Sequence, residues 1–206
     1  MTHLRHYSIA ILSIVALGAC AKKDAGTTDS ATASSTTPSA VDSTASSTTS
    51  STSSGGLSDA NILAQEHGGD SAEVVIGRFA STHASDASVK AYANLLVSDH
   101  GKGQREVEAL EKKLVITPQA PPDDTVAQET AHTLEHLGTL KGRDFDTAFV
   151  AHEIQDHQTD IADARKASAA AQLPEVKTLV DKSLPELQKH LNRGQSLAKK
   201  LGIKAS

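Results

Sequence analysis

The chain has 206 residues, a formal net charge of −5 and a pI near 6.0, so its length allows one ordinary domain with appendages. Aromatic residues make up only 2% of it and Trp is absent, which argues against an aromatic-rich β-sandwich and against a stacking surface for single-stranded nucleic acid. Because the chain is mildly acidic, we expect no nucleic-acid partner. The single Cys excludes an internal disulfide and a four-Cys metal site.

Residues 1–20 have the pattern of a bacterial export signal. Their apolar run at 9–17 is too short to span a bilayer. It leads into the sequence LGAC, and small residues before a Cys resemble a lipobox, in which the Cys thiol is acylated and becomes the new N-terminus. We therefore predict a lipoprotein signal peptide over 1–20 with lipidation at Cys20. The alternative is a Cys that is buried in a signal peptide cut nearby.

The residues after Cys20 suggest where such a lipoprotein resides. Ala21, rather than Asp, follows the Cys, which is the outer-membrane sorting pattern. Each buried acyl CH₂ contributes about 0.8 kcal/mol, so several acyl chains anchor a protein firmly. We expect a periplasm-facing lipoprotein of the bacterial cell envelope, in the outer membrane. Its expected partner is the membrane, through the N-terminal lipid, and no protein partner is identified.

Residues 21–56 are rich in Ser and Thr and cannot bury enough apolar area to offset the entropy of ordering them. We predict a disordered tether with a reach of roughly 30–36 Å. Residues 57–206 instead carry helical periodicity, with no sustained alternation of period two. Ser58 is a plausible N-cap, and Pro185 should kink the last helix. The predicted helices span 58–82, 86–114, 123–139, 143–171 and 174–201.

Apolar residues recur at helical spacing along each of the four long helices, which predicts an all-α bundle. Each of these apolar stripes contains one ionisable residue near the middle of its helix. These residues are, in chain order, Glu73, His100, His157 and His190.

The connection between the helices at 86–114 and 143–171 decides whether these four residues meet. His100 and His157 fall at the midpoints of their helices, whereas Glu73 lies past its midpoint by about 4–5 Å at 1.5 Å per residue. His190 lies past the midpoint of the last helix by the same distance. All four residues therefore lie at the same level along the bundle axis if the first and last helices are parallel. A connection that contains its own helix is long enough to climb the bundle, as in ferritin-like folds. We therefore predict a ferritin-like four-helix bundle with a helical crossover between the second and third long helices.

Several short motifs together resemble a bacterial family, the domain of unknown function 4142, over residues 57–198. The motifs are EVVIGRFA from Glu73, DH at Asp99, GRDFD at 142–146, HQ at His157, and LP at 184–185 with His190. The resemblance implies an exported ferritin-like bundle of unestablished activity, with the functional positions Glu73, Asp99, His100, Asp146, His157 and His190. Two positions depart from the family pattern: Leu96 stands where we expect Met, and Phe149 where we expect Tyr.

One carboxylate and three imidazoles in an apolar bundle suit a first-row divalent ion. We predict that Glu73, His100, His157 and His190 bind a single Zn, Cu, Mn or Fe ion, because a di-iron site needs four carboxylates and two Glu-x-x-His motifs. Four more acids are expected to hold the outer ring nitrogens: Asp99, Asp146, Glu153 and Asp156. The function expected is metal handling or stress protection, without commitment to an enzyme or a catalytic residue.

The alternative is a buried polar network in a non-enzymatic interaction or structural module of the envelope. Glu73 would then satisfy His100, and Asp146 or Glu153 would satisfy His157. A third pattern, the HTLEH sequence at 132–136, fits the H-x-x-E-H motif of zinc peptidases. We set it aside because it lies on the short crossover helix, where a solvated helix face is expected.

Overall fold

The computed structural model describes residues 57–203, and within these residues all regular structure is helical. The predicted export signal, the lipidation site at Cys20 and the tether up to residue 56 lie outside the described residues. No helix in the described part of the chain combines the length and apolar character needed to cross a bilayer. The helices are α1 (Asp59–His83), α2 (Ala87–Leu114), α3 (Val126–Gly138), α4 (Gly142–Ala170) and α5 (Pro174–Leu201).

The helix ends follow local sequence signals. Ser58 caps α1 with a capping box: its hydroxyl accepts from the Asn61 backbone N–H at 3.1 Å, while the Asn61 side chain accepts from the Ser58 N–H at 3.2 Å. Asp86 caps α2 by accepting from the two N–H groups of the first turn. The last helix, α5, begins with a Pro in its first turn and continues through Pro185 to the left-handed Gly202.

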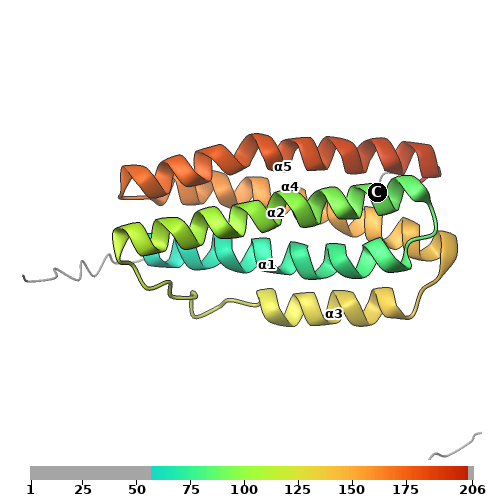
Figure 1. Ribbon diagram of the computed structural model, residues 1–206, viewed down its shortest axis with the longest axis horizontal. Coiled ribbons are helices and arrows are strands. Elements are labelled where there is room, and N and C mark those ends of the chain that lie inside the picture. Colours follow the sequence, from blue (N-terminus) through green and yellow to red (C-terminus); the bar gives the residue numbers. More distant parts are fainter. Residues whose placement is uncertain (1–56, 204–206) are drawn as a thin grey trace, which may run out of the picture. The chain divides into compact units, whose positions relative to one another are not determined.

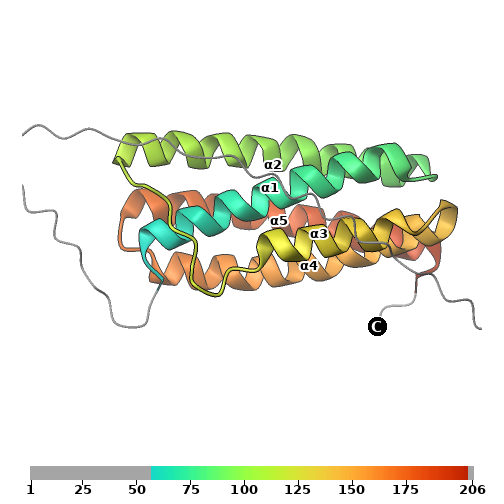
Figure 2. The same cartoon turned by 90° about the horizontal axis from the view of Figure 1, so that it is seen from below.

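The four long helices form two hairpins, α1 with α2 and α4 with α5, and α3 lies outside them (Figure 1). In Figure 1, α1 and α5 run from left to right, whereas α2 and α4 run from right to left. The connection that contains α3 therefore climbs the bundle, as the sequence predicts for a ferritin-like crossover. Figure 2 shows α3 alongside α1 and α4, which are the two helices it packs against.

Two apolar clusters fill the two halves of the bundle. One joins the C-terminal half of α1 and the N-terminal half of α4, with Leu96, Phe145 and Phe149 fully buried in it. The other joins the opposite halves of the same helices and includes Ile62 and Val176. Between the clusters lies a layer of buried polar side chains, which we call the polar layer: Glu73, His100, Glu153, His157 and His190.

The two departures from the family pattern lie in the first apolar cluster. Leu96 and Phe149 are both fully buried there, and the Phe149 ring lies 6.2 Å from the Tyr92 ring, centroid to centroid. Tyr92 supplies a hydroxyl near the polar layer, because its O–H donates to the backbone carbonyl of His190 at 3.1 Å. A hydroxyl therefore reaches this region from α2, although position 149 has none.

Candidate metal centre

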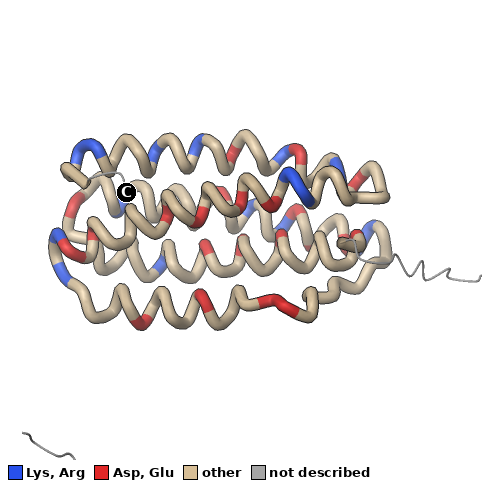
Figure 3. Tube along the Cα trace, turned by 180° about the vertical axis from the view of Figure 1, so that it is seen from behind, with Lys and Arg blue, Asp and Glu red and all other residues tan. Residues whose placement is uncertain are grey.

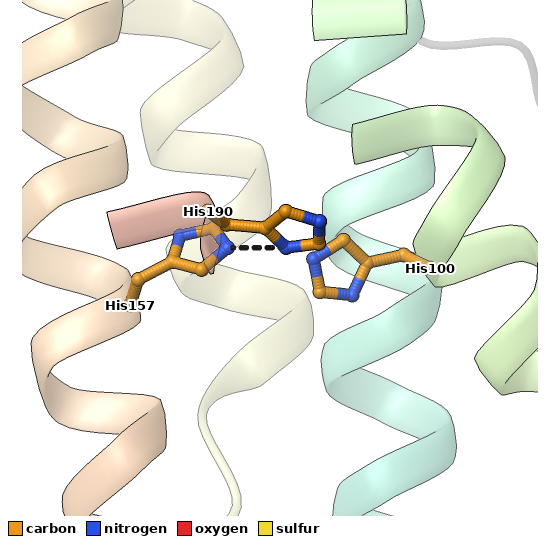
Figure 4. Close-up of side chains that lie close together, drawn as sticks. All are labelled: His100, His157 and His190. Carbon is orange, nitrogen blue, oxygen red and sulfur yellow. Dashed lines mark hydrogen bonds between the residues drawn. The ribbon is translucent and has the colours of Figure 1, made fainter. Parts of the chain in front are cut away.

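Three histidines from three different helices converge in the polar layer (Figure 4). His100 comes from α2, His157 from α4 and His190 from α5. Their ring centroids are 5.1 to 5.6 Å apart, and each ring offers a nitrogen within 4.8 Å of the other two. All three side chains are buried. Since a metal ion needs its ligand atoms this close together, the triad has the dimensions of a metal site.

In His157 and His190, one ring nitrogen points toward the other two histidines and is called the inner nitrogen here. The other, outer nitrogen has a hydrogen-bond partner that identifies the tautomer of the ring. Nδ1 of His157 lies 2.9 Å from the backbone carbonyl oxygen of Glu153, and Nε2 of His190 lies 3.0 Å from a carboxylate oxygen of Asp99. Both oxygens are acceptors, so each outer nitrogen donates its N–H. In the neutral rings the inner nitrogens, Nε2 of His157 and Nδ1 of His190, then carry lone pairs.

These two inner nitrogens lie 3.3 Å apart, which makes two lone pairs face each other unless a cation stands near them. A proton is a poor candidate, because burial and the neighbouring His100 and His190 lower the pKa of His157 to about 3. Burial also lowers the pKa of His190, although the hydrogen bond to Asp99 opposes this shift. Both inner nitrogens are therefore placed where one metal ion could accept their lone pairs.

His100 is held in the same way by a residue that sequence reasoning missed. Its Nδ1 lies 2.8 Å from a carboxylate oxygen of Asp70, while its Nε2 is buried without a hydrogen-bond partner. Figure 4 shows a nitrogen of His100 turned toward the other two rings. Gly103 makes room for this contact, because a Cβ there would lie 2.5 Å from the Asp70 carboxylate. The available signal was spacing, since Asp70 precedes Glu73 by three residues on α1.

Glu73 lies next to the triad, so the structure brings together all four residues that the apolar stripes single out. Its Oε2 is 4.0 Å from Nε2 of His100, and neither of its oxygens has a hydrogen-bond partner. Burial raises the pKa of Glu73 well above its usual range, and the nearby Glu153 and Asp156 raise it further. Burial and Asp156 do the same to Glu153, whose two oxygens are also unpartnered.

The four acids expected to hold outer ring nitrogens behave differently. Asp99 holds His190, and Glu153 holds His157 through its backbone carbonyl rather than its carboxylate. Asp146 holds no histidine: it accepts hydrogen bonds from Ser85 and Asp86 at the start of α2. It precedes His157 by 11 residues, or about 16 Å along the helix, which is too far to reach the ring. Asp156 forms no hydrogen bond with a histidine ring among the described residues and lies instead with Glu73 and Asp160.

The other patterns considered from the sequence are not part of this centre. The buried-network alternative pairs His100 with Glu73, but the hydrogen-bond partner of His100 is Asp70. The two histidines of the H-x-x-E-H pattern, His132 and His136, are exposed on α3. Neither belongs to a cluster of potential metal ligands in the described part of the chain.

A cavity of about 200 Å³ borders the triad. His100 and His190 line one part of it, and its wall also carries the carboxylates of Glu66, Asp70 and Asp160. Burial, followed by the charge of Asp70, raises the pKa of Glu66 to about 7. The cavity therefore gives a small cation an acid-lined space next to two of the three rings.

Comparisons with known proteins agree with this architecture. The crystal structure of a "putative secreted protein DUF305 from Streptomyces coelicolor" is similar, with a TM-score of 0.62 at 13% identity, and the match covers 72% of this chain and 96% of that one. Comparison of the sequence with curated proteins gives no match. The model of the family described as "Domain of unknown function (DUF4142)" matches residues 42–197, beginning inside the segment predicted to be a tether. The chain therefore belongs to the DUF4142 family.

Proposed function

We propose that this bundle binds one divalent transition-metal ion, such as Zn, Cu, Mn or Fe, through His100, His157 and His190, with Glu73 as a fourth ligand. The observation that carries the proposal is the 3.3 Å separation of two ring nitrogens whose outer N–H groups are already donated elsewhere. A metal ion accepts both lone pairs, which converts a repulsive contact into two bonds. Nitrogen ligands with one carboxylate suit borderline ions of this kind.

The hydrogen bonds on the outer nitrogens support the proposal further. Ligating histidines commonly donate their second N–H to a carboxylate or a backbone carbonyl, which fixes the tautomer and the ring orientation. Asp70, the Glu153 carbonyl and Asp99 do this for the three rings. Because the pKa of His157 is low, protons compete weakly for this ligand at neutral pH.

The cavity beside the triad would let the ion enter and would leave one coordination position open to water or a small molecule. Structural zinc sites are closed by four protein ligands, whereas sites that exchange ligands keep an open position. His100 and His190 face the cavity, so water or a small molecule can approach the proposed ion there. This arrangement suits metal handling or stress protection, in which an ion or its ligand exchanges.

The proposed place of action is the bacterial cell envelope. The export pattern in residues 1–20 supports it, and so does the similarity to a structure described as a putative secreted protein. We propose that an acyl group on Cys20 anchors the chain in the outer membrane, facing the periplasm. The membrane would then be its partner through the N-terminal lipid.

The experiment is metal analysis of the purified protein, after chelation and reloading with Zn²⁺. We expect about one tightly bound ion at the triad in the wild type, its loss in His100→Gln/His190→Gln, and its retention in the control His132→Gln/His136→Gln, which removes two exposed histidines of α3. Circular dichroism checks that each variant is folded. Equal Zn²⁺ content in all three proteins would refute the proposal.

The alternative is a non-enzymatic interaction or structural module with a His/carboxylate network. The hydrogen bonds from His100 to Asp70 and from His190 to Asp99 favour it, because satisfied buried pairs can fix helix register. The same variants separate the two functions. A structural network predicts a lower free energy of unfolding in His100→Gln/His190→Gln and no difference in bound metal.

A further inference from the structure

A second group of polar residues extends the polar layer toward the interface of α1 and α4. Between Arg143 and Arg165, α4 contains several acids and no Lys or Arg. The stretch of α1 from Asp59 to Gly77 likewise has no Lys or Arg. Figure 3 shows the acidic positions recurring along the bundle. The facing parts of these two helices therefore carry acidic groups with no Lys or Arg of either helix among them.

Three of these acids lie close enough to share one cation. Glu73 of α1 and Asp156 and Asp160 of α4 each offer a carboxylate oxygen, and the three oxygens lie within 4.8 Å of one another. Around a hard cation with bonds of about 2.0–2.6 Å, two ligand oxygens are at most roughly 4–5 Å apart. The spacing on α4 supports the arrangement, since residues at i and i+4 point to the same side of a helix.

The burial of two glutamates is a second observation that points to a ligand. Glu73 is 2% exposed, Glu153 is fully buried, and none of their four carboxylate oxygens accepts a hydrogen bond from an N–H or hydroxyl group. Their neighbours are other acids, since Glu73 lies within hydrogen-bond reach of the carboxyl groups of Glu153 and Asp156. The only salt-bridge partners of these two glutamates among the described residues are histidines, at 4.0 Å and 3.7 Å. A buried carboxylate in its charged form costs several kcal/mol, so such groups are paired, bound to a metal or protonated.

We propose that Glu73, Asp156 and Asp160 form a second cation site, made of oxygen ligands alone and adjacent to the histidine triad. Glu73 lies between the two sites and bridges them, with one oxygen toward His100 and the carboxylate within reach of both aspartates. Glu153 lies next to the shared position, because its carboxylate belongs to the cluster that Glu73 forms with His157. The bundle would therefore hold a nitrogen-rich site and an oxygen-rich site side by side.

The chemical class of the second ion follows from the ligands. Carboxylate oxygens without nitrogen or sulfur suit hard divalent cations such as Mn²⁺, Mg²⁺ or Ca²⁺. The cavity reaches this site, because Asp160 forms part of its wall.

The competing explanation is that the acids share protons and bind no ion. The two explanations separate in a titration of the purified protein, first loaded with one equivalent of Zn²⁺ and then titrated with Mn²⁺. Electron paramagnetic resonance measures free Mn²⁺, and mass analysis of the intact protein gives the number of ions per chain. We expect one Mn²⁺ to bind per Zn²⁺-loaded chain.

The variant Asp156→Asn/Asp160→Asn tests the assignment of the ligands. It should weaken Mn²⁺ binding by more than about 100-fold, since even outer-sphere changes cost 10–100-fold, and it should leave bound Zn²⁺ unchanged. The matched control Glu129→Gln/Glu135→Gln removes two exposed acids of α3 and should bind Mn²⁺ like the wild type.

The two proposed sites can fail separately. The variant His100→Gln/His190→Gln should lose Zn²⁺ and still bind one Mn²⁺, because the oxygen ligands remain. Wild-type protein that binds no Mn²⁺, or an Asp156→Asn/Asp160→Asn protein that binds it undiminished, would overturn the second site. Neither result would alter the expectation for Zn²⁺ at the triad.

Discussion

The ends and the middle of the bundle are built on opposite principles. The two apolar clusters bury side chains that need no partner, and Leu96 and Phe149 are fully buried there. The polar layer between them buries ionisable groups, and both oxygens of Glu73 and of Glu153 lack hydrogen-bond partners. Apolar burial stabilises the folded state, whereas an unpaired buried carboxylate opposes it. The ends therefore hold the fold together, and the middle is the part that stability alone does not explain.

The two regions also differ in how their residues are positioned. In the apolar clusters, shape decides the contacts. In the polar layer, directional hydrogen bonds aim each ring: Asp70 orients His100, and Asp99 orients His190. Such orientation of ring nitrogens by outer hydrogen bonds is common among metal-ligating histidines, which supports the proposal that the polar layer binds an ion.

The largest expected effect is that substitutions in the two regions change the free energy of unfolding in opposite directions. Phe149→Ala should lower the free energy of unfolding by about 3–5 kcal/mol, because it removes buried area and leaves a cavity. In the metal-free protein, Glu73→Leu should instead raise it by on the order of 1–4 kcal/mol, because an apolar residue replaces an unpaired buried acid. Urea denaturation in the presence of chelator measures both. A destabilised, metal-free Glu73→Leu protein would break the comparison.

A smaller effect on metal affinity is expected at Gly103, which leaves room for the hydrogen bond between His100 and Asp70. Gly103→Ala should displace the Asp70 carboxylate, since the new Cβ would lie 2.5 Å from its oxygen, and so release His100. We expect Zn²⁺ affinity to fall by about 10–100-fold, which calorimetric titration can measure. Gly69→Ala is the control, because no atom lies within 4 Å of the added Cβ. Equal affinities in the two variants would mean that Asp70 does not orient the ring.

The smallest effect concerns pH. The pKa of Glu66 is raised from 4.5 to about 7, so the folded state binds more protons than the unfolded state between these values. The contribution of Glu66 to stability is therefore full below pH 4.5 and lost as the pH rises through 7. The pKa of His157 is lowered from 6.5 to about 3, so the unfolded state binds more protons between these values. The contribution of His157 to stability is therefore lost as the pH falls below 6.5. In chemical denaturation of the metal-free protein, the free energy of unfolding should fall less between pH 5 and 8 in Glu66→Gln than in the wild type.

The fold was largely predictable from the sequence because its signals are local. Apolar periodicity and the helix breakers placed each long helix within a residue of its observed start and end, as with α4, predicted over 143–171 and observed over Gly142–Ala170. The short crossover helix α3 was less well bounded, beginning at Val126 rather than at residue 123. The direction of the crossover depends on tertiary packing. The sequence therefore indicated only that the four residues would meet if the connection climbed the bundle.

The candidate site was predictable only in part. A residue in the middle of an apolar stripe must be buried, which identifies Glu73 and the three histidines. The partners of the rings depend on helix rotation and on rotamers, which the stripes do not specify. Asp70 was therefore missed, and Asp146 was expected to hold a ring nitrogen although it lies about 16 Å from His157 along α4.

The most direct test is to locate the ion itself. Crystals of the protein grown with Zn²⁺ and measured at the zinc absorption edge give its position independently of any model of the chain. We predict an anomalous peak about 2.0–2.1 Å from Nε2 of His100, Nε2 of His157 and Nδ1 of His190. A peak only at His132 and His136 on α3, or no peak between the three rings, would contradict the account.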